Sequence, residues 1–364
     1  KIMKNILKTA VVLFTALSFS FANAGELSVT GNAKASYVIV SSDSPTGTQE
    51  QPNSLGVANE FTLSAGGELD NGMTFGYNID IDGDTTQDDG SLFLDTGSLG
   101  KIMISISEGG LETSKKGILS ATGDRGSDSA YDEGMFEEWS VGDANNISYH
   151  LPADLLPFGV KASVAYAPST VADANQSVNN LVASNTGAIT AANNSGKVYT
   201  TGSLANAGRN FTQYQVSAAP IDGLALGASY GTFGGATGDT GQEGEGGAWY
   251  ATYALNNVSL GYSKSYVSLP TARTAATYES VLGHKYSALI AVNDDLKVSY
   301  GVEKSEATHM LSTTADVEQE VTQIAAAYTT GGLTLAVSMN DFENALYTAN
   351  RDVKATVFNV SMAF

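Results

Sequence analysis

The sequence predicts an all-β protein, an antiparallel barrel of 16 strands that crosses a membrane. Three observations support this fold class. Apolar and polar residues alternate along most of the chain, short turns alternate with long polar connections, and no apolar run reaches the about 20 residues that a membrane-spanning helix needs. The 364 residues include 39 glycines and no cysteine, and only 15% are charged, below the ~25% of ordinary soluble domains.

The amino end has the pattern of a secretory signal. Lys1, Lys4 and Lys8 accompany an apolar stretch at 9–21, which Ala-Asn-Ala follows at 22–24. A retained anchor helix is the alternative, but the apolar stretch is too short for a comfortable span. We therefore predict a signal peptide over 1–24 and a single barrel domain over 25–364.

The strands are predicted from side-chain alternation with a period of two, which sends successive residues to opposite faces. In the segment 73–82, one face is apolar and the other is polar or glycine. The apolar face is formed by Met73, Phe75, Tyr77, Ile79 and Ile81. Similar alternation starts at Leu27, Ile102, Leu224, Val258, Leu296 and Leu333. Tyrosines on the apolar faces are expected to form girdles at the membrane interfaces. They are Tyr37, Tyr77, Tyr149, Tyr166, Tyr230, Tyr262 and Tyr300.

Two kinds of connection alternate between these segments. The short ones lie at 70–72, 96–98, 152–157, 220–223, 256–257, 293–295 and 330–332. The long ones lie near 41–53, 83–90, 107–143, 168–210, 231–247, 268–276, 305–316 and 343–351. Together they join 16 strands and place both chain ends on the short-turn side, as in outer-membrane barrels. A soluble β-sandwich shows the same alternation of side chains, but it has no need for alternating loop lengths.

The last strand ends the chain on an aromatic residue. Phe358, Val360, Met362 and Phe364 share one face. This ending resembles the terminal signal by which the barrel-assembly machinery recognises outer-membrane barrels. The four residues are therefore the predicted assembly signal.

With these features together, the chain resembles the general porins of Gram-negative bacteria, in particular the alphaproteobacterial type. The segments 146–152, 158–160 and 165–168 look like a hairpin of that family, and 98–102 is similar to its strand before the constriction loop. Near 98–102, a Phe-Gly and a later Gly-Arg that are usual in the family are replaced. The resemblance implies secretion to the periplasm and a homotrimer in the outer membrane, in contact with lipid and lipopolysaccharide.

The resemblance also implies that the third long loop, at about 107–143, folds inward and narrows the pore. This loop holds nine acidic and three basic residues, a net charge of −6. The acidic candidates for the constriction are Glu108, Glu112, Asp124, Asp128, Asp132, Glu133, Glu137 and Glu138, with Asp143 at the end of the loop. The basic candidates are Lys34, Arg125, Lys161, Lys285 and Lys297. Carboxylates in a narrow passage attract cations, so a cation preference is expected unless these acids are solvated away from the constriction.

An acidic cluster in the second loop is a candidate calcium site, because calcium takes 6 to 8 oxygen ligands. Its residues are Asp80, Asp82, Asp84 and Asp88. The EF-hand pattern fails here, since no glycine occupies the sixth position and Ser91 occupies the twelfth. We expect no other cofactor.

Charge and motifs exclude several functions. The net charge of −20 disfavours nucleic acid as a partner, and no nucleophile elbow, P-loop or zinc-protease motif is present. His150, His284 and His309 fall on separate predicted elements, so we expect no enzyme. The expected function is passive diffusion of ions and small hydrophilic solutes. A substrate-specific channel and a secreted β-rich adhesin or surface-coat protein are the alternatives.

Overall fold

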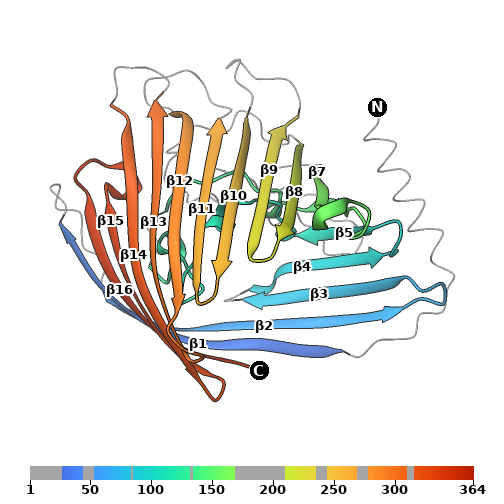
Figure 1. The fold of residues 1–364 in the computed structure, drawn as a ribbon, viewed down its shortest axis with the longest axis horizontal. Coiled ribbons are helices and arrows are strands. Elements are labelled where there is room, and N and C mark those ends of the chain that lie inside the picture. The colour runs from blue at the N-terminus through green and yellow to red at the C-terminus, as the bar shows by residue number, and fades with distance from the viewer. Residues whose placement is uncertain are drawn as a thin grey trace.

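The structure, a computed structural model, describes residues 27–43, 53–82, 85–131, 134–168, 210–234, 244–268, 278–309 and 315–364. These residues form a closed barrel of 16 strands, in which every strand pairs with its neighbours in sequence and β1 pairs with β16 (Figure 1). All sixteen pairings are antiparallel, so the predicted fold class is confirmed. The predicted signal peptide at 1–24 lies outside the described residues.

The first eight strands are β1 (Ser28–Asp43), β2 (Ser54–Glu68), β3 (Thr74–Asp82), β4 (Thr85–Asp95), β5 (Lys101–Ile106), β6 (Asn146–His150), β7 (Lys161–Ala167) and β8 (Phe211–Ile221). The second eight are β9 (Leu224–Phe233), β10 (Glu245–Leu255), β11 (Val258–Ser268), β12 (Tyr278–Ala291), β13 (Leu296–His309), β14 (Val317–Thr330), β15 (Leu333–Glu343) and β16 (Asp352–Ala363). Each predicted short turn joins two of these strands. No helix in the described part of the chain is long and apolar enough to span a membrane.

Side chains alternate between the interior and the outer surface of the barrel, as the period of two predicts. On β12, Val281 and Lys285 are buried against the interior, whereas Tyr286 and Ile290 lie on the outer surface and are exposed. The outer surface is therefore rich in exposed apolar and aromatic side chains, and the interior in polar ones. A water-soluble sandwich would have the opposite arrangement.

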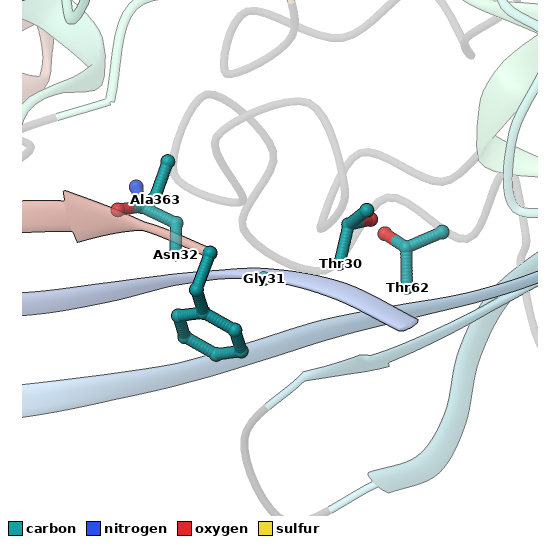
Figure 2. Close-up of a pocket in the computed structure, with 6 residues that line it drawn as sticks. Thr30, Gly31, Asn32, Thr62 and Ala363 are labelled. Atoms are coloured by element: carbon teal, nitrogen blue, oxygen red, sulfur yellow. The ribbon is translucent and has the colours of Figure 1, made fainter. Parts of the chain in front are cut away.

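The barrel closes where the last residue meets the first strand. Gly31 and Phe364 exchange two backbone hydrogen bonds of 2.9 and 3.0 Å, and the Phe364 ring packs edge-on against Phe61 with centroids 5.7 Å apart. Thr30, Asn32 and Thr62 line an open recess beside this junction (Figure 2). All four residues of the predicted assembly signal lie on the outer surface and are exposed. Their role in assembly stays a prediction.

Several predicted long connections are shorter in the structure, and in proportion the difference is largest for the second one. Residues 85–90 were expected in a loop but belong to β4, where Asp80 pairs with Asp89 and Ile79 with Gly90. Asp and Gly have low β-propensity, so the sequence pattern predicts a loop for this segment. Pairing with β3 and β5 overrides that propensity.

The third long connection lies inside the barrel, as expected. Between β5 and β6, the chain forms three short 3-10 turns, η1 (Ser114–Gly117), η2 (Gly126–Asp128) and η3 (Val141–Asp143). Loop backbone atoms bond to interior side chains: Leu119 N–H donates to Ser287 Oγ and Ala121 N–H to Ser299 Oγ, both at 2.8 Å. We call residues 107–145 the internal loop.

Candidate functional site

We call residues 107–125 of the internal loop its outgoing half and residues 134–145 its returning half. The returning half packs into an apolar cluster within the barrel. Trp139 lies edge-on between Phe136 and Phe233, with ring centroids 5.3 Å away on each side. Val141 and Phe211 are fully buried in the same cluster. Burial of aromatic side chains is a large source of stability, so this half of the loop is a packed part of the interior.

Two buried amides join the two halves of the loop to the wall. Gln213 of β8 accepts from the N–H groups of Leu111 and Val141 at 3.3 and 2.9 Å and donates to the Trp139 carbonyl at 3.0 Å. Asn146 of β6 donates to the carbonyl of Glu108 at 2.7 Å and to two carbonyls of the returning half. The start and end of the loop are therefore held at one place.

Glu138 attaches the outgoing half of the loop to β9. Its carboxylate accepts from the backbone N–H groups of Thr113 and Ser114, the latter at 2.8 Å, and from Ser229 Oγ at 2.5 Å. Burial raises the pKa of Glu138 to about 7, although these hydrogen bonds lower it. Asp143, at the end of the loop, also has its pKa raised to about 7, first by burial and then by the charge of Glu112.

Four charges, three of them buried, attach the loop to β12 and β13. Glu137 contacts both Arg125 and Lys285, and Glu303 lies 3.1 Å from the Lys285 ammonium and 3.6 Å from Arg125. Glu303 also accepts from Ser127 N–H at 3.0 Å and Ser127 Oγ at 2.8 Å. Two positive and two negative charges meet here, so the cluster is neutral.

The loop also reaches β14 and β1. Asp124 forms an ion pair of 2.7 Å with Lys34 of β1, and its carbonyl accepts from Gln323 of β14 at 3.2 Å. These contacts fix the turn of the loop beside the junction of the first and last strands.

Another acidic contact lies where the loop leaves β5. Burial raises the pKa of Glu108, and the neighbouring charge of Asp80 raises it further, while a hydrogen bond from Ser91 lowers it. Asp80 accepts from Thr62 Oγ1 at 2.5 Å, and Glu112 accepts from Ser140 Oγ at 2.7 Å. These acids are only partly buried, unlike Glu137 and Glu138.

The structure brings several of the predicted site residues together. Arg125, Lys285 and Glu137 share one cluster, and Lys34 pairs with Asp124. Asp128 is exposed, 3.4 Å from Arg125. Lys161 and Lys297 are exposed near the short-turn ends of β7 and β13, on the interior-facing set of positions. Asp132 and Glu133 lie outside the described residues.

For Glu137 and Glu138 the placement differs from the expectation. Both were expected to line the open constriction, but they are only 6% and 3% exposed. Their oxygens are engaged by cations, backbone N–H groups and a serine, so they attach the loop to the wall. Sequence reasoning missed Glu303, Gln213 and Asn146. All three fall on the interior-facing positions of their strands, which is the signal that would have found them.

The candidate calcium residues do not assemble into a described site. Asp80 is described, and it contacts Thr62 and Glu108. Asp84 and the side chains of Asp82 and Asp88 lie outside what the structure describes. Among the described side chains, no group of three or more His, Asp or Glu residues is arranged to hold a metal ion.

Comparison with solved structures finds the same fold in porins and in another outer-membrane protein. The chain superposes on the anion-selective porin of Comamonas acidovorans with a TM-score of 0.62 and 13% identity, covering 93% of this chain and all of that one. OmpF of Salmonella typhi gives 0.60 and 12%, covering 93% and 98%. OmpT of Vibrio cholerae gives 0.60 and 12%, covering 94% and 99%. No family profile and no curated sequence matches. The resemblance to porins is thus confirmed at the level of the fold.

Breaking the four-charge cluster should destabilise the protein and loosen the loop. In Lys285→Met, Glu137 and Glu303 keep only Arg125 as a cation. Removing one partner of a buried ion pair costs about 3–5 kcal/mol, so the urea midpoint of the folded barrel in detergent should fall. Lys297→Met removes an exposed lysine from the next strand and should change stability by less than about 0.5 kcal/mol. Equal midpoints for the two variants would contradict the structural role of the cluster.

Stability of the loop should depend on pH through Glu138. Because its pKa is raised from 4.5 to about 7, the folded state binds this proton more tightly than the unfolded state. The stabilising effect of this proton is complete below the unfolded-state pKa of 4.5 and is lost as the pH rises through the folded-state pKa of about 7. Hydrogen exchange of the Thr113 and Ser114 amides, corrected for intrinsic rate, should show less protection at about pH 8 than at about pH 5.

The matched variants for this pH dependence are Glu138→Gln and Asp128→Asn. The first removes one of the two loop acids whose pKa is raised to about 7, the other being Asp143, and should weaken the pH dependence of protection at Thr113 and Ser114. The second removes an exposed acid of the same loop and should leave that dependence unchanged. A pH dependence that is equally strong in Glu138→Gln would assign the titration to another group.

Proposed function

We propose that the protein is a passive diffusion channel of the bacterial outer membrane, which passes ions and small hydrophilic solutes and prefers cations. The observation that supports this most directly is a closed barrel of 16 strands whose internal loop is attached along one side. Barrels of about eight strands are filled by their own side chains, whereas 16 strands leave an aqueous channel. No enzymatic step is part of the proposal.

The open side of the barrel is the side that the loop does not cover. Apart from the two ends that Asn146 holds, the internal loop bonds mainly to β8, β9 and β11 to β15. Its residue Asp124 also pairs with Lys34 of β1. On β2 to β7, many interior-facing polar side chains remain partly or fully exposed. They include Thr62, Asn78, Lys101, His150, Lys161 and Ser163. A polar, water-accessible wall of this kind suits hydrophilic solutes.

The proposed cation preference rests on acids that remain partly exposed inside the barrel. Asp80 and Asp89 face the interior from β3 and β4, and Glu108 and Glu112 belong to the outgoing half of the loop. Acidic groups along a low-dielectric wall raise the local concentration of cations and repel anions. The anion-selective porin from Comamonas shares this fold, so the preference is set by side chains and not by the fold.

The outer surface supports a membrane location. Exposed apolar residues cover it, and the predicted girdle tyrosines, such as Tyr37, Tyr77, Tyr230 and Tyr300, lie there with 41% to 49% of their surface exposed. Outward apolar bands with aromatic girdles are typical of barrels in the outer membrane. Lipid and lipopolysaccharide are then the molecules around the barrel.

One part of the outer surface fits a second copy of the chain better than lipid. Leu55 and Val57, on the long-loop half of β2, are 78% and 76% exposed and pair with Tyr37 and Ala35 of β1. Leu55 is 13 residues from the end of β2 at Glu68, which at ~3.3 Å per residue reaches beyond the mid-membrane band. At that level the outer positions of β13 to β15 are charged, with Lys304, Glu306, Glu318, Glu320 and Glu343. We propose a homotrimer joined through β1 and β2, and OmpT of Vibrio cholerae has a trimer form.

Conductance in a planar bilayer tests the channel and its ion preference. The purified protein should give large conductance steps, and a salt gradient should give a reversal potential of the sign expected for cations. Asp80→Asn with Glu108→Gln should reduce the cation-to-anion permeability ratio by about fivefold, the equivalent of about 1 kcal/mol. Glu306→Gln with Glu318→Gln, on the outer surface, should leave the ratio unchanged. Anion preference would refute the charge assignment, and folded protein without steps would refute the channel.

The trimer is tested by placing charge on its proposed interface. Leu55→Glu with Val57→Glu puts two carboxylates where apolar surfaces meet, and should convert the trimer to monomer in sedimentation of detergent-solubilised protein. Leu55→Met with Val57→Ile keeps the surface apolar and should keep the trimer. A trimer that survives the two glutamates would place the interface elsewhere.

A further inference from the structure

The turn η1 presents two lysines to the interior of the barrel. Ser114 and Gly117, at its ends, are buried against the wall, whereas Lys115 and Lys116, between them, are exposed. In a turn of four residues, this pattern sends the two lysine side chains away from the wall. Within the barrel, the space away from the wall is the aqueous passage.

The wall holds the base of this turn firmly. The Ser114 carbonyl accepts from Ser263 Oγ at 2.7 Å, and its N–H donates to Glu138 at 2.8 Å. Gly117 packs directly on the backbone of Tyr262, and a Cβ at this position would overlap the Tyr262 carbonyl and Ser263. Because both ends of the turn are fixed, the two lysines are held at this position beside the passage.

No carboxylate of the described chain lies within salt-bridge distance of either lysine. Asp143 is near enough for Lys115 to lower its pKa, but burial and Glu112 outweigh that effect. In contrast, Glu137 and Glu138 are buried, and Asp124 is paired with Lys34. At η1, the acid-rich loop therefore presents positive charge to the passage.

We propose that Lys115 and Lys116 form a binding site for small dianions inside the passage, of the chemical class of hydrogen phosphate. Each ammonium offers three hydrogen-bond donors, and a dianion with several oxygens can accept from both lysines at once. At physiological salt, attraction between charges extends over about 8 Å. A dianion bound to one lysine is therefore also attracted by the lysine next to it. The proposal rests on the proposed channel function, which it deepens by naming a class of solute that is retained.

A bound dianion also affects the other ions. It occupies part of the narrowed passage and neutralises the two lysines, so it obstructs cation flow while it stays. Added hydrogen phosphate should therefore lower the conductance of single channels in a saturable way when ionic strength is kept constant with chloride.

The experiment compares three proteins in the same bilayer titration. The unaltered chain should show a saturable decrease in conductance with phosphate. Lys115→Gln with Lys116→Gln should raise the half-saturating concentration at least about tenfold. Lys354→Gln removes an exposed lysine on the outer surface of β16 and should leave it unchanged. Equal titrations for the unaltered chain and the double variant would overturn the proposal.

A second measurement separates this site from the channel itself. Broadening of the phosphorus-31 resonance of phosphate by the folded, detergent-solubilised protein reports binding without conduction. Broadening that disappears in the double variant supports the site even if no conductance steps are seen, a result that would refute only the channel. Conductance without broadening in the unaltered chain would refute the site and leave the channel standing.

Discussion

Closure of the backbone ladder is the constraint on which the whole structure depends. A strand with a free edge in lipid leaves N–H and C=O groups unpaired, and each such group costs several kcal/mol. In this chain, β1 pairs with β16 over twelve residue pairs, and the last residue continues that ladder with Gly31. The apolar outer surface, the polar interior and the room for an internal loop all require this closed circle.

Inside the circle, the loop is held by polar groups that satisfy one another. A buried charge is stable only when it is paired and hydrogen-bonded. Arg125, Glu137 and Glu303 are paired and hydrogen-bonded, and Lys285 is ion-paired with both carboxylates. Gln213 and Asn146 bond to the loop backbone through their amides. The result separates two uses of charge. Some charged residues attach the loop, and others remain in contact with water.

The alternation of side chains and of connection lengths was enough to predict the fold class, the strand number and all seven short turns. Both signals come from local geometry, which a single sequence displays directly. The prediction of a loop at 85–90 was wrong. The Asp and Gly residues of this segment favour loops, and only pairing with neighbouring strands makes it part of β4.

Less of the candidate site could be predicted, for a physical reason. Sequence gives the net charge of the loop, but not which carboxylates are buried. Glu137 and Glu138 are adjacent to Trp139, an aromatic residue in the apolar cluster, and they enter the wall contact with it. Their partners Lys285 and Ser229 come from strands that are distant in sequence. Such pairings depend on tertiary structure, which local patterns do not contain.

The attachment of the loop to one side divides the interior wall into two parts with different freedom to vary. Interior positions on β8, β9 and β11 to β15 contact the loop, so a substitution there disturbs packing or an ion pair. Interior positions on β2 to β4 mostly face water, and side chains there can change in size and charge at little cost in stability. The side chains that face the open interior can therefore change over evolution on one wall, while the other wall maintains the contacts that hold the internal loop.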